Sequence, residues 1–577
     1  MNQAIRTATP RLHRLDTWRG VCLCATIVLC ATAYSFRLTS FLHAKETVLQ
    51  LGTVGMACLL AARGQGFGPA FRAYCPLWGG LGVAVGSGLL LAQVPALVWE
   101  EGIRCAALLL AALLAFDLQD NAIWRGRIFD ALLASAVAVG LLGILQYAGL
   151  IPFCLPPVEG YDQRAYSVFG NQDLFGGYLA IALPLLIHRL PRNPLAGYPA
   201  LAVILTALVL SGSRSAWLAA AAGILIGFPY SKADLRRWRL PGALAAVALA
   251  IAVALTWPQT SARVRNTLSP QDAGGRIRLW IWDGTRRMIR DQPLFGVGLG
   301  NYRYWSPRYL GEALHAPGGE RHRHNELHTI HAHCEPLECW AETGIVGTAF
   351  GLWMLLRLLR RRGPAWGALA ALLVFSLFNA AWHSAPHALA GLLLAGTLLH
   401  HSSDTGDRLP GRRGWGALAF SASVFLVAFG GGTTLVPSYY LRAAEDVHLA
   451  GGPAVPYYQR VFAHGWPNAT AQEECGMALL DAGRTREAYD RFLRALPGLD
   501  TGRLYQLLGV TAAQLEEYQT ARQWLWDCLW RWPGNQRAWD LLGTITPAAE
   551  RPPWIQHGRR WRLTAPGEPR PTPGPTP

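Results

Sequence analysis

The fold of this chain is decided by a polar stretch that begins GRIRLWIWDGTRRMIRDQPLFGVGLGNYRYW (residues 275–305) and ends HAHCEPLECWAETGIVG (residues 331–347). The stretch is dense in Arg and His, and long apolar runs lie on both sides of it. A membrane protein that keeps such a segment between two spans usually carries its chemistry there. We therefore expect the rest of the chain to hold this segment at the lipid boundary.

Composition places the chain among membrane proteins. It has 577 residues, of which 51% are hydrophobic and 15% charged, whereas soluble domains carry roughly 25% charged residues. The formal net charge of +16 would suit a nucleic-acid partner, but the arginines concentrate in short loops between apolar runs, where membrane topology places them. We predict an all-α, polytopic membrane protein with membrane lipids around it and no nucleic-acid partner.

Apolar runs set the number of spans. A perpendicular span needs about 20 apolar residues, so the shorter runs have soft boundaries, and we expect about 12–13 transmembrane helices. The runs cover residues 19–36, 47–62, 77–97, 102–117, 128–150, 173–190, 195–211, 213–229, 240–257, 336–359, 365–383, 385–401 and 415–436.

Loop charges orient these spans. If residues 1–18 form a cytoplasmic leader and the spans alternate, the inner loops hold most of the short-loop cations, while the short outer loop Trp99–Gly102 is acidic. This agrees with the positive-inside rule. Residues 258–335 then form a large periplasmic loop within a membrane domain of residues 19–436, and Arg214 lies at the outer end of its span.

The C-terminal part differs in composition. Residues 437–550 show helical patterning in which Ala488 matches Ala521 and Pro497 matches Pro533, a period of roughly 33–36 residues that is close to a tetratricopeptide repeat. We predict a tetratricopeptide-like helical domain, on the outer side, which could bind a protein partner. Residues 551–577 are Pro-rich and are predicted to be a disordered tail.

Two segments begin with polar side chains at the ends of spans. Arg214 in LVLSGSRSAWLAA is either functional, as intramembrane arginines usually are, or a cation that reaches the interface along its own stem. Asn171 and Asp173 precede another apolar run and favour a helix cap over a substrate contact. Gly176 and Gly177 would let a neighbouring helix approach closely.

The segment 275–293 reads as an amphipathic helix, with Leu279 and Met288 toward the membrane surface and arginines near the headgroups. The planar guanidinium fork matches phosphate oxygens, so these arginines suit a phosphate or pyrophosphate ligand. The alternative is an interfacial helix whose arginines meet lipid phosphate. The arginines in question are Arg276, Arg278, Arg286 and Arg287.

The histidines allow two kinds of chemistry. His331 and His333 with Glu335 and Glu338 could bind a metal, but the spacing lacks a diagnostic pattern such as HExxH. Imidazole also titrates near neutrality and can accept a proton from an incoming hydroxyl, with the carboxylates orienting the ring. We therefore expect acid–base work, with no metal and no cofactor.

Four motifs in order resemble the O-antigen ligase / Wzy-type polymerase superfamily: NQDLFGGYLA (171–180), SGSRSAW (211–217), GR…DQPLFGVGLGNY (275–302) and HAHCEPLECWAETGIVG (331–347). The resemblance covers about residues 130–400. It implies a GT-C-like, multi-pass enzyme of the bacterial inner membrane. Such an enzyme transfers glycan from an undecaprenyl-pyrophosphate carrier to a lipid or saccharide acceptor hydroxyl, without metal, and inverts the anomeric carbon.

The resemblance also implies roles for particular residues. Arg214, Arg276 and His333 would be catalytic, although Arg278, Arg286 or Arg287 could replace Arg276 and would otherwise contact the pyrophosphate. Glu335 and Glu338 would support His333. Ligase, polymerase and protein O-glycosyltransferase stay open within the enzyme class, and a transporter or permease or a non-catalytic scaffold for polysaccharide export is the alternative outside it.

Overall fold

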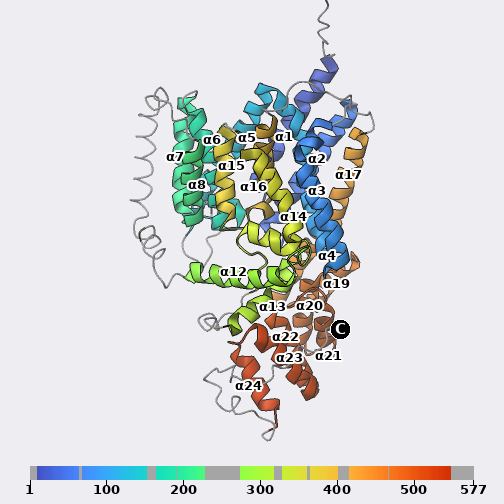
Figure 1. Ribbon diagram of the computed structural model, residues 1–577. Coiled ribbons are helices and arrows are strands. Elements are labelled where there is room, and N and C mark those ends of the chain that lie inside the picture. The colour runs from blue at the N-terminus through green and yellow to red at the C-terminus, as the bar shows by residue number, and fades with distance from the viewer. Residues whose placement is uncertain are drawn as a thin grey trace, which may run out of the picture.

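The fold is a long helical bundle with a smaller helical group at one end, as the computed structural model shows (Figure 1). The structure describes residues 10–63, 68–151, 164–190, 193–227, 261, 273–316, 328–359, 361, 364–400, 415–465 and 467–547. Over these residues it contains helices and no strand, because the apolar runs satisfy their backbone polar groups within each segment. The predicted all-α, polytopic fold is confirmed.

Nearly every expected apolar run corresponds to a helix; the run at 240–257 lies outside the described residues. Five helical stretches of the described chain are long and apolar enough to cross a membrane, and shorter apolar helices accompany them. The bundle helices are α1 (Pro10–Thr32), α2 (Phe41–Arg63), α3 (Gly68–Leu91), α4 (Pro95–Phe116), α5 (Ala122–Tyr147), α6 (Gln172–Arg189), α7 (Pro194–Leu210), α8 (Arg214–Gly227), α14 (Glu335–Leu359), α15 (Pro364–Ser376), α16 (Ala385–His400) and α17 (Trp415–Gly430), with short helical turns η1 (Asp117–Asp120), η2 (Ser167–Phe169) and η4 (Ala381–His383) between them.

Ion pairs connect the helices at the end of the bundle where α1 begins. Arg19 is fully buried, pairs with Asp117 at 2.6 Å and donates to the carbonyl oxygen of Leu114 at 2.7 Å. His400 pairs with Asp120 at the same end. These contacts join the start of α1 to the ends of α4 and α16 at one end of the bundle.

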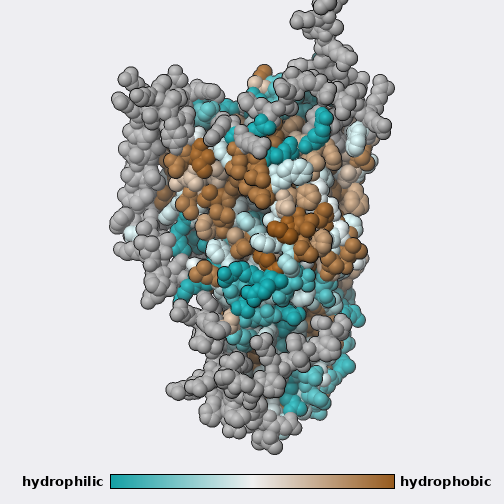
Figure 2. All heavy atoms as spheres, viewed as in Figure 1, coloured by the Kyte–Doolittle hydropathy of each residue, from teal (hydrophilic) through white to brown (hydrophobic). Residues whose placement is uncertain are grey.

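The polar segment lies at the opposite end. There α12 (Ala273–Asp291) lies across the bundle, followed by α13 (Tyr302–His315) (Figure 1). Figure 2 shows a hydrophilic zone at this level, next to a hydrophobic belt over the bundle. Leu279 is exposed, as expected, but the expected exposure of Met288 is wrong: it is fully buried in a small core with Trp280 and Tyr302, because α12 packs on α13.

The C-terminal helices form a second core beyond the polar segment. The predicted boundary at residue 437 falls inside a helical stretch, because α17 passes through a turn of π-helix, η5 (Gly431–Leu435), into α18. The remaining helices are α18 (Val436–Leu449), α19 (Val455–Ala463), α20 (Ala469–Asp481), α21 (Thr485–Ala495), α22 (Gly502–Gln514), α23 (Tyr518–Arg531) and α24 (Gln536–Ile545).

The second core is docked on the polar segment by α23. His315 at the end of α13 stacks on Trp530 with ring centroids 4.3 Å apart, and its Nε2 lies 3.0 Å from the Trp530 carbonyl oxygen. The C-terminal helices therefore share one end of the bundle with α12 and Arg214. The tetratricopeptide assignment and a protein partner for these helices stay predictions, and the tail at 551–577 lies outside the described residues.

Candidate functional site

Arg214 is held at the start of α8 by a turn rich in serine. Ser211 donates from Oγ to the Leu208 carbonyl oxygen at 2.7 Å, and Ser215 Oγ accepts from the Asn379 amide at 2.8 Å. Trp217 adds a bond from its indole N–H to the Leu208 oxygen at 2.9 Å. The half-buried Arg214 is thus carried on a fixed backbone, beside helix N–H groups that favour anions.

The turn before α8 lies against the start of α6. A Cβ at Gly176 would stand 2.7 Å from Ser211 Oγ, so only a glycine lets the two segments approach this closely. Asn171 caps α6, accepting from the N–H groups of Asp173 at 2.8 Å and Leu174 at 3.0 Å. The predicted cap is confirmed. Asp173, one turn before Gly176, is thereby placed near the Arg214 turn.

Arg278 connects α12 to this same place. Its Nη2 lies 3.6 Å from Asp173 Oδ2, with both side chains partly exposed. Arg276 is exposed and precedes Arg278 by two residues on α12. The structure therefore places the start of α6 against the Arg214 turn and joins it to α12 through Arg278.

Arg286 and Arg287 belong to a different part of α12. Both pair with Asp283, at 2.9 Å and 3.0 Å. At 1.5 Å per helical residue they stand about 12–13 Å further along the axis than Arg278. Of the arginines expected to contact pyrophosphate, Arg278 is the one that the structure joins to α6.

His333 completes the group from a tight segment before α14. Its φ is 50°, in the left-handed region that non-glycine residues rarely occupy. The Trp282 indole of α12 donates to the carbonyl oxygen of Ala332 at 3.1 Å, so the segment is tied to α12. Burial, then the charges of Arg278 and His331, lower the pKa of His333 to about 4, although Asp173 opposes them.

Helix α12 connects these groups, because Trp282 is bonded to the His333 segment and Arg278 pairs with Asp173. An imidazole, a carboxylate and a guanidinium are thus carried at the end of the bundle where α12 lies. The arrangement can bind an anion and accept a proton beside it.

Arg164 is a further guanidinium that the sequence analysis missed. A Cβ at Gly212 would lie 2.6 Å from Arg164 Cδ, so this side chain passes directly over the Arg214 turn. The Ala165 N–H donates to the Leu210 carbonyl oxygen at 3.0 Å and fixes the crossing. A usable signal was present: Arg164 stands seven residues before the NQD motif that carries the resemblance.

The glycine-rich GVGLGN stretch supports α14 and has no strand–turn–helix unit around it. Gly344 has φ 65° at a kink in α14, and a Cβ there would stand 2.0 Å from the Leu294 carbonyl oxygen. The N–H groups of Val297 and Gly298 donate to the carbonyl oxygens of Ala341 and Glu342 at 2.8 Å and 2.9 Å. The two motifs therefore interlock and set the position of the first turns of α14.

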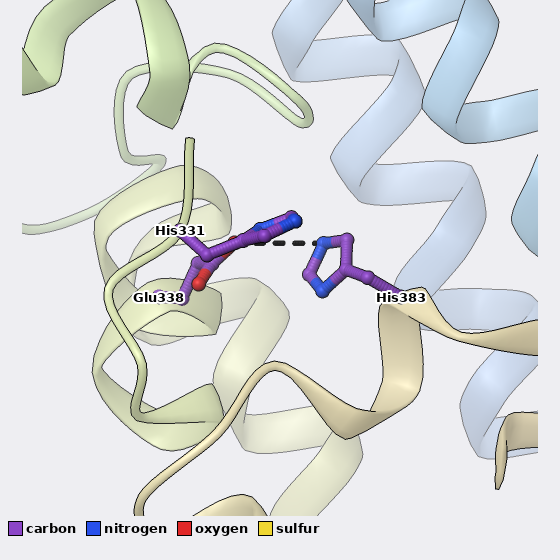
Figure 3. Close-up of side chains that lie close together, drawn as sticks. All are labelled: His331, Glu338 and His383. Atoms are coloured by element: carbon purple, nitrogen blue, oxygen red, sulfur yellow. Dashed lines mark hydrogen bonds and ion pairs between the residues drawn. The ribbon is translucent and has the colours of Figure 1, made fainter. Parts of the chain in front are cut away.

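Glu335 and Glu338 face histidines other than His333; Figure 3 shows Glu338 with His331 and His383. Glu338 Oε1 lies 2.7 Å from His331 Nδ1, and Oε2 accepts from the Ala332 N–H at 2.8 Å. Glu335 Oε1 accepts from the Trp382 N–H at 2.7 Å. The expected support of His333 by these carboxylates is thus indirect, through the backbone of its segment.

His383 belongs to this second group and was missed by the sequence analysis. It lies in the α15–α16 connection, and its ring centroid is 4.2 Å from that of His331. Burial alone would lower its pKa, but the carboxylates of Glu338, Glu335 and Glu101 together raise it to about 10. Burial lowers the pKa of His331 to about 3, and the charge of His383 adds to this.

One family model matches part of the chain. The family model described as O-Antigen ligase matches residues 199–352, a range that contains Arg214, all of α12 and His333. Comparison with curated proteins gave no match. Similarity to that family over this range, with the multi-pass helical fold, supports a membrane enzyme of polysaccharide biogenesis that transfers glycosyl groups.

Proposed function

We propose that this protein transfers a glycan from an undecaprenyl-pyrophosphate carrier to an acceptor hydroxyl at the outer face of the bacterial inner membrane. The observation that carries the proposal is the Arg278–Asp173 pair beside the turn that carries Arg214, with the His333 segment bonded to the same helix, α12. An anionic leaving group on a lipid carrier fits arginines at the boundary of an apolar bundle.

In the proposed reaction the leaving group gathers charge. The acceptor oxygen attacks the anomeric carbon, the bond from that carbon to the diphosphate oxygen breaks, and the configuration inverts. Arg214 and Arg276, with Arg278 beside them, would stabilise the growing charge on the diphosphate from fixed positions. Because arginine supplies this stabilisation, the proposal needs no metal at the reacting atoms.

His333 has the complementary task. Its neutral ring would accept the proton of the acceptor hydroxyl as the new bond forms. The unusual backbone of His333 supports such a role, since strained conformations concentrate at functional sites. The proposed side of the membrane follows from the loop charges, which assign the short Arg-rich loops to the cytoplasm and this end of the bundle to the periplasm.

The test is transfer by the purified full-length protein in lipid nanodiscs, with an undecaprenyl-pyrophosphate-linked oligosaccharide and candidate acceptors. Transfer that is lost in Arg214→Ala, Arg276→Ala and His333→Ala, with normal membrane insertion, supports the proposal. Movement of the lipid-linked glycan across vesicles without product would favour a transporter. No activity in any arm with intact binding of export partners would favour a scaffold.

The acceptor class is decided by deleting the gene and analysing surface glycans. A ligase would leave free core lipid together with carrier-linked polymer. A polymerase would leave single repeat units. A protein O-glycosyltransferase would leave unmodified acceptor protein with both lipid products normal.

A further inference from the structure

Three side chains from two segments converge: His331 and Glu338, which flank His333 in the sequence, and His383 from the α15–α16 connection (Figure 3). One candidate ligand atom from each lies within 4.8 Å of the others. We propose that these side chains bind one Zn²⁺ ion, which joins the start of α14 to the α15–α16 connection. The ion would stand apart from the reacting atoms, so this site goes beyond the proposed transfer reaction.

The distances suit a tetrahedral ion. Zinc bonds to nitrogen and oxygen at about 2.0–2.1 Å, which places tetrahedral ligand atoms about 3.3 Å apart. His383 Nε2 lies 3.5 Å from Glu338 Oε1 and 3.4 Å from Glu101 Oε1. His331 Nδ1 is hydrogen-bonded to Glu338 at 2.7 Å and would need to move by about 0.6 Å to make room for zinc.

Neighbouring hydrogen bonds hold these ligands in position. The second oxygen of Glu338 accepts from the Ala332 N–H at 2.8 Å. The Trp382 backbone next to His383 is fixed from both sides, since its N–H donates to Glu335 at 2.7 Å and its oxygen accepts from Arg104 at 2.7 Å. Bonds of this kind orient metal ligands and are typical of metal sites.

The charge of the cluster also favours a cation. Oxygens of Glu101, Glu335 and Glu338 each lie within 3.5 Å of a His383 ring nitrogen. Arg104 donates to Glu101 at 2.9 Å and offsets one of these charges. Buried carboxylates are costly unless a cation compensates them. A divalent ion between the two imidazoles and Glu338 would balance the remaining two charges.

The rival explanation is that His383 itself, protonated, is the cation and that no ion binds. The zinc content of the purified protein distinguishes a bound ion from a protonated His383. Full-length protein in detergent is stripped with a chelator, incubated with Zn²⁺ alone, dialysed and analysed for zinc per chain. We expect about one ion per chain in the parent protein and at least a tenfold weaker retention in Glu338→Gln and His383→Gln. His448→Gln is the matched control, because His448 pairs with Asp481 at 2.8 Å in the C-terminal helices and should leave zinc retention unchanged.

If the variants fail to fold, X-ray absorption spectroscopy of the zinc-loaded parent protein still tests the proposal, because it identifies the zinc ligands directly. We expect a first shell of nitrogen and oxygen at about 2.0–2.1 Å that includes two imidazoles. Absence of retained zinc in the parent, equal retention in both folded variants, or a sulfur shell would each overturn the proposal. Metal binding is measured without glycan, so its failure leaves the proposed transfer untouched, and the reverse also holds.

Discussion

Two histidines only two residues apart belong to regions of opposite character. The segment of His333 is bonded to α12, whose Arg278 pairs with Asp173, whereas His331 faces Glu338 and His383. The first region contains guanidinium groups, and its Arg278 and Asp173 side chains are partly exposed. The second gathers carboxylates, and its central Glu338 is 2% exposed. Neighbouring regions of one segment therefore suit ions of opposite charge, as the two proposals require.

One connection serves both regions. Asn379 at the end of α15 donates to Ser215 in the Arg214 turn, and four residues later His383 enters the carboxylate cluster. We expect variants in the first region to lose transfer activity and variants in the second region to lose stability.

The largest effect is expected for His333→Ala. Loss of a general base costs about 10²–10⁴-fold in kcat, while the half-buried ring contributes little to folding. Transfer kinetics and thermal unfolding of the purified variant check both halves of this expectation. His448→Ala, in the C-terminal helices, is the control. Transfer at the parental rate would remove His333 from the reaction.

Arg214→Ala should follow, with a loss of about 10²–10³-fold in kcat, the range for removing one fixed donor to a charged transition state. Arg214→Lys should recover only part of the rate, because lysine lacks the planar fork. Arg286→Ala is the matched control: its side chain is 67% exposed and paired with Asp283, and such pairs contribute about 0–1 kcal/mol. Equal losses in both arginine variants would contradict the assignment of transition-state stabilisation to Arg214 and not to Arg286.

Glu338→Ala tests the second region through stability. Removing one partner of a buried ionic group costs about 3–5 kcal/mol, since His331 and His383 would lose their shared carboxylate. The free energy of unfolding, measured in chelator, should fall by this amount. His333→Ala measured beside it should change by less than about 1 kcal/mol. A reversed order would break the comparison between the two regions.

Gly176→Ala should perturb the Arg214 turn mildly. The new Cβ would lie 2.7 Å from Ser211 Oγ and 3.0 Å from Ala216 Cβ, an overpacking that costs about 1 kcal/mol or more. Displacement of Arg214 should lower kcat about tenfold, since small misplacements are costly in catalysis. Gly82→Ala is the control, because a Cβ there meets nothing within 4 Å. An unchanged kcat would show that the turn tolerates movement.

The smallest effect is expected for Asp173→Asn. The Arg278–Asp173 pair at 3.6 Å is partly exposed, so its loss should change stability by less than about 1 kcal/mol. Release of Arg278 toward the diphosphate should lower the KM for the lipid-linked donor by up to about fivefold. Donor titration of the variant checks this. A raised KM would mean that Asp173 itself contacts the substrate.

The sequence predicted most of the fold because the span signal is local. Apolar length alone identifies a helix such as α5, and loop arginines assign alternating directions. The family resemblance also pointed to Arg214, to His333 and to Arg276 or a neighbouring arginine of α12. Each of these residues lies within a short motif, so the residues next to it in the sequence were enough to identify it.

The carboxylate cluster could not be predicted in this way. His383 stands in the apolar stretch AAWHSAPHALA, and Glu101 lies more than 200 residues before Glu338, so tertiary packing alone brings them together. The inward position of Met288 has the same origin: the amphipathic pattern of α12 identifies an apolar face, but α13 covers part of it. The periodicity of a sequence shows that one face of a helix is buried, but it does not show which element packs against that face.

The central claim is most directly tested by an experimental structure of the full chain in a nanodisc with undecaprenyl pyrophosphate bound. The account predicts the diphosphate within hydrogen-bond distance of Arg214 and of Arg276 or Arg278, with His333 facing the side from which an acceptor would arrive. A diphosphate bound elsewhere, or contacted by Arg286 and Arg287 in place of these residues, would contradict it.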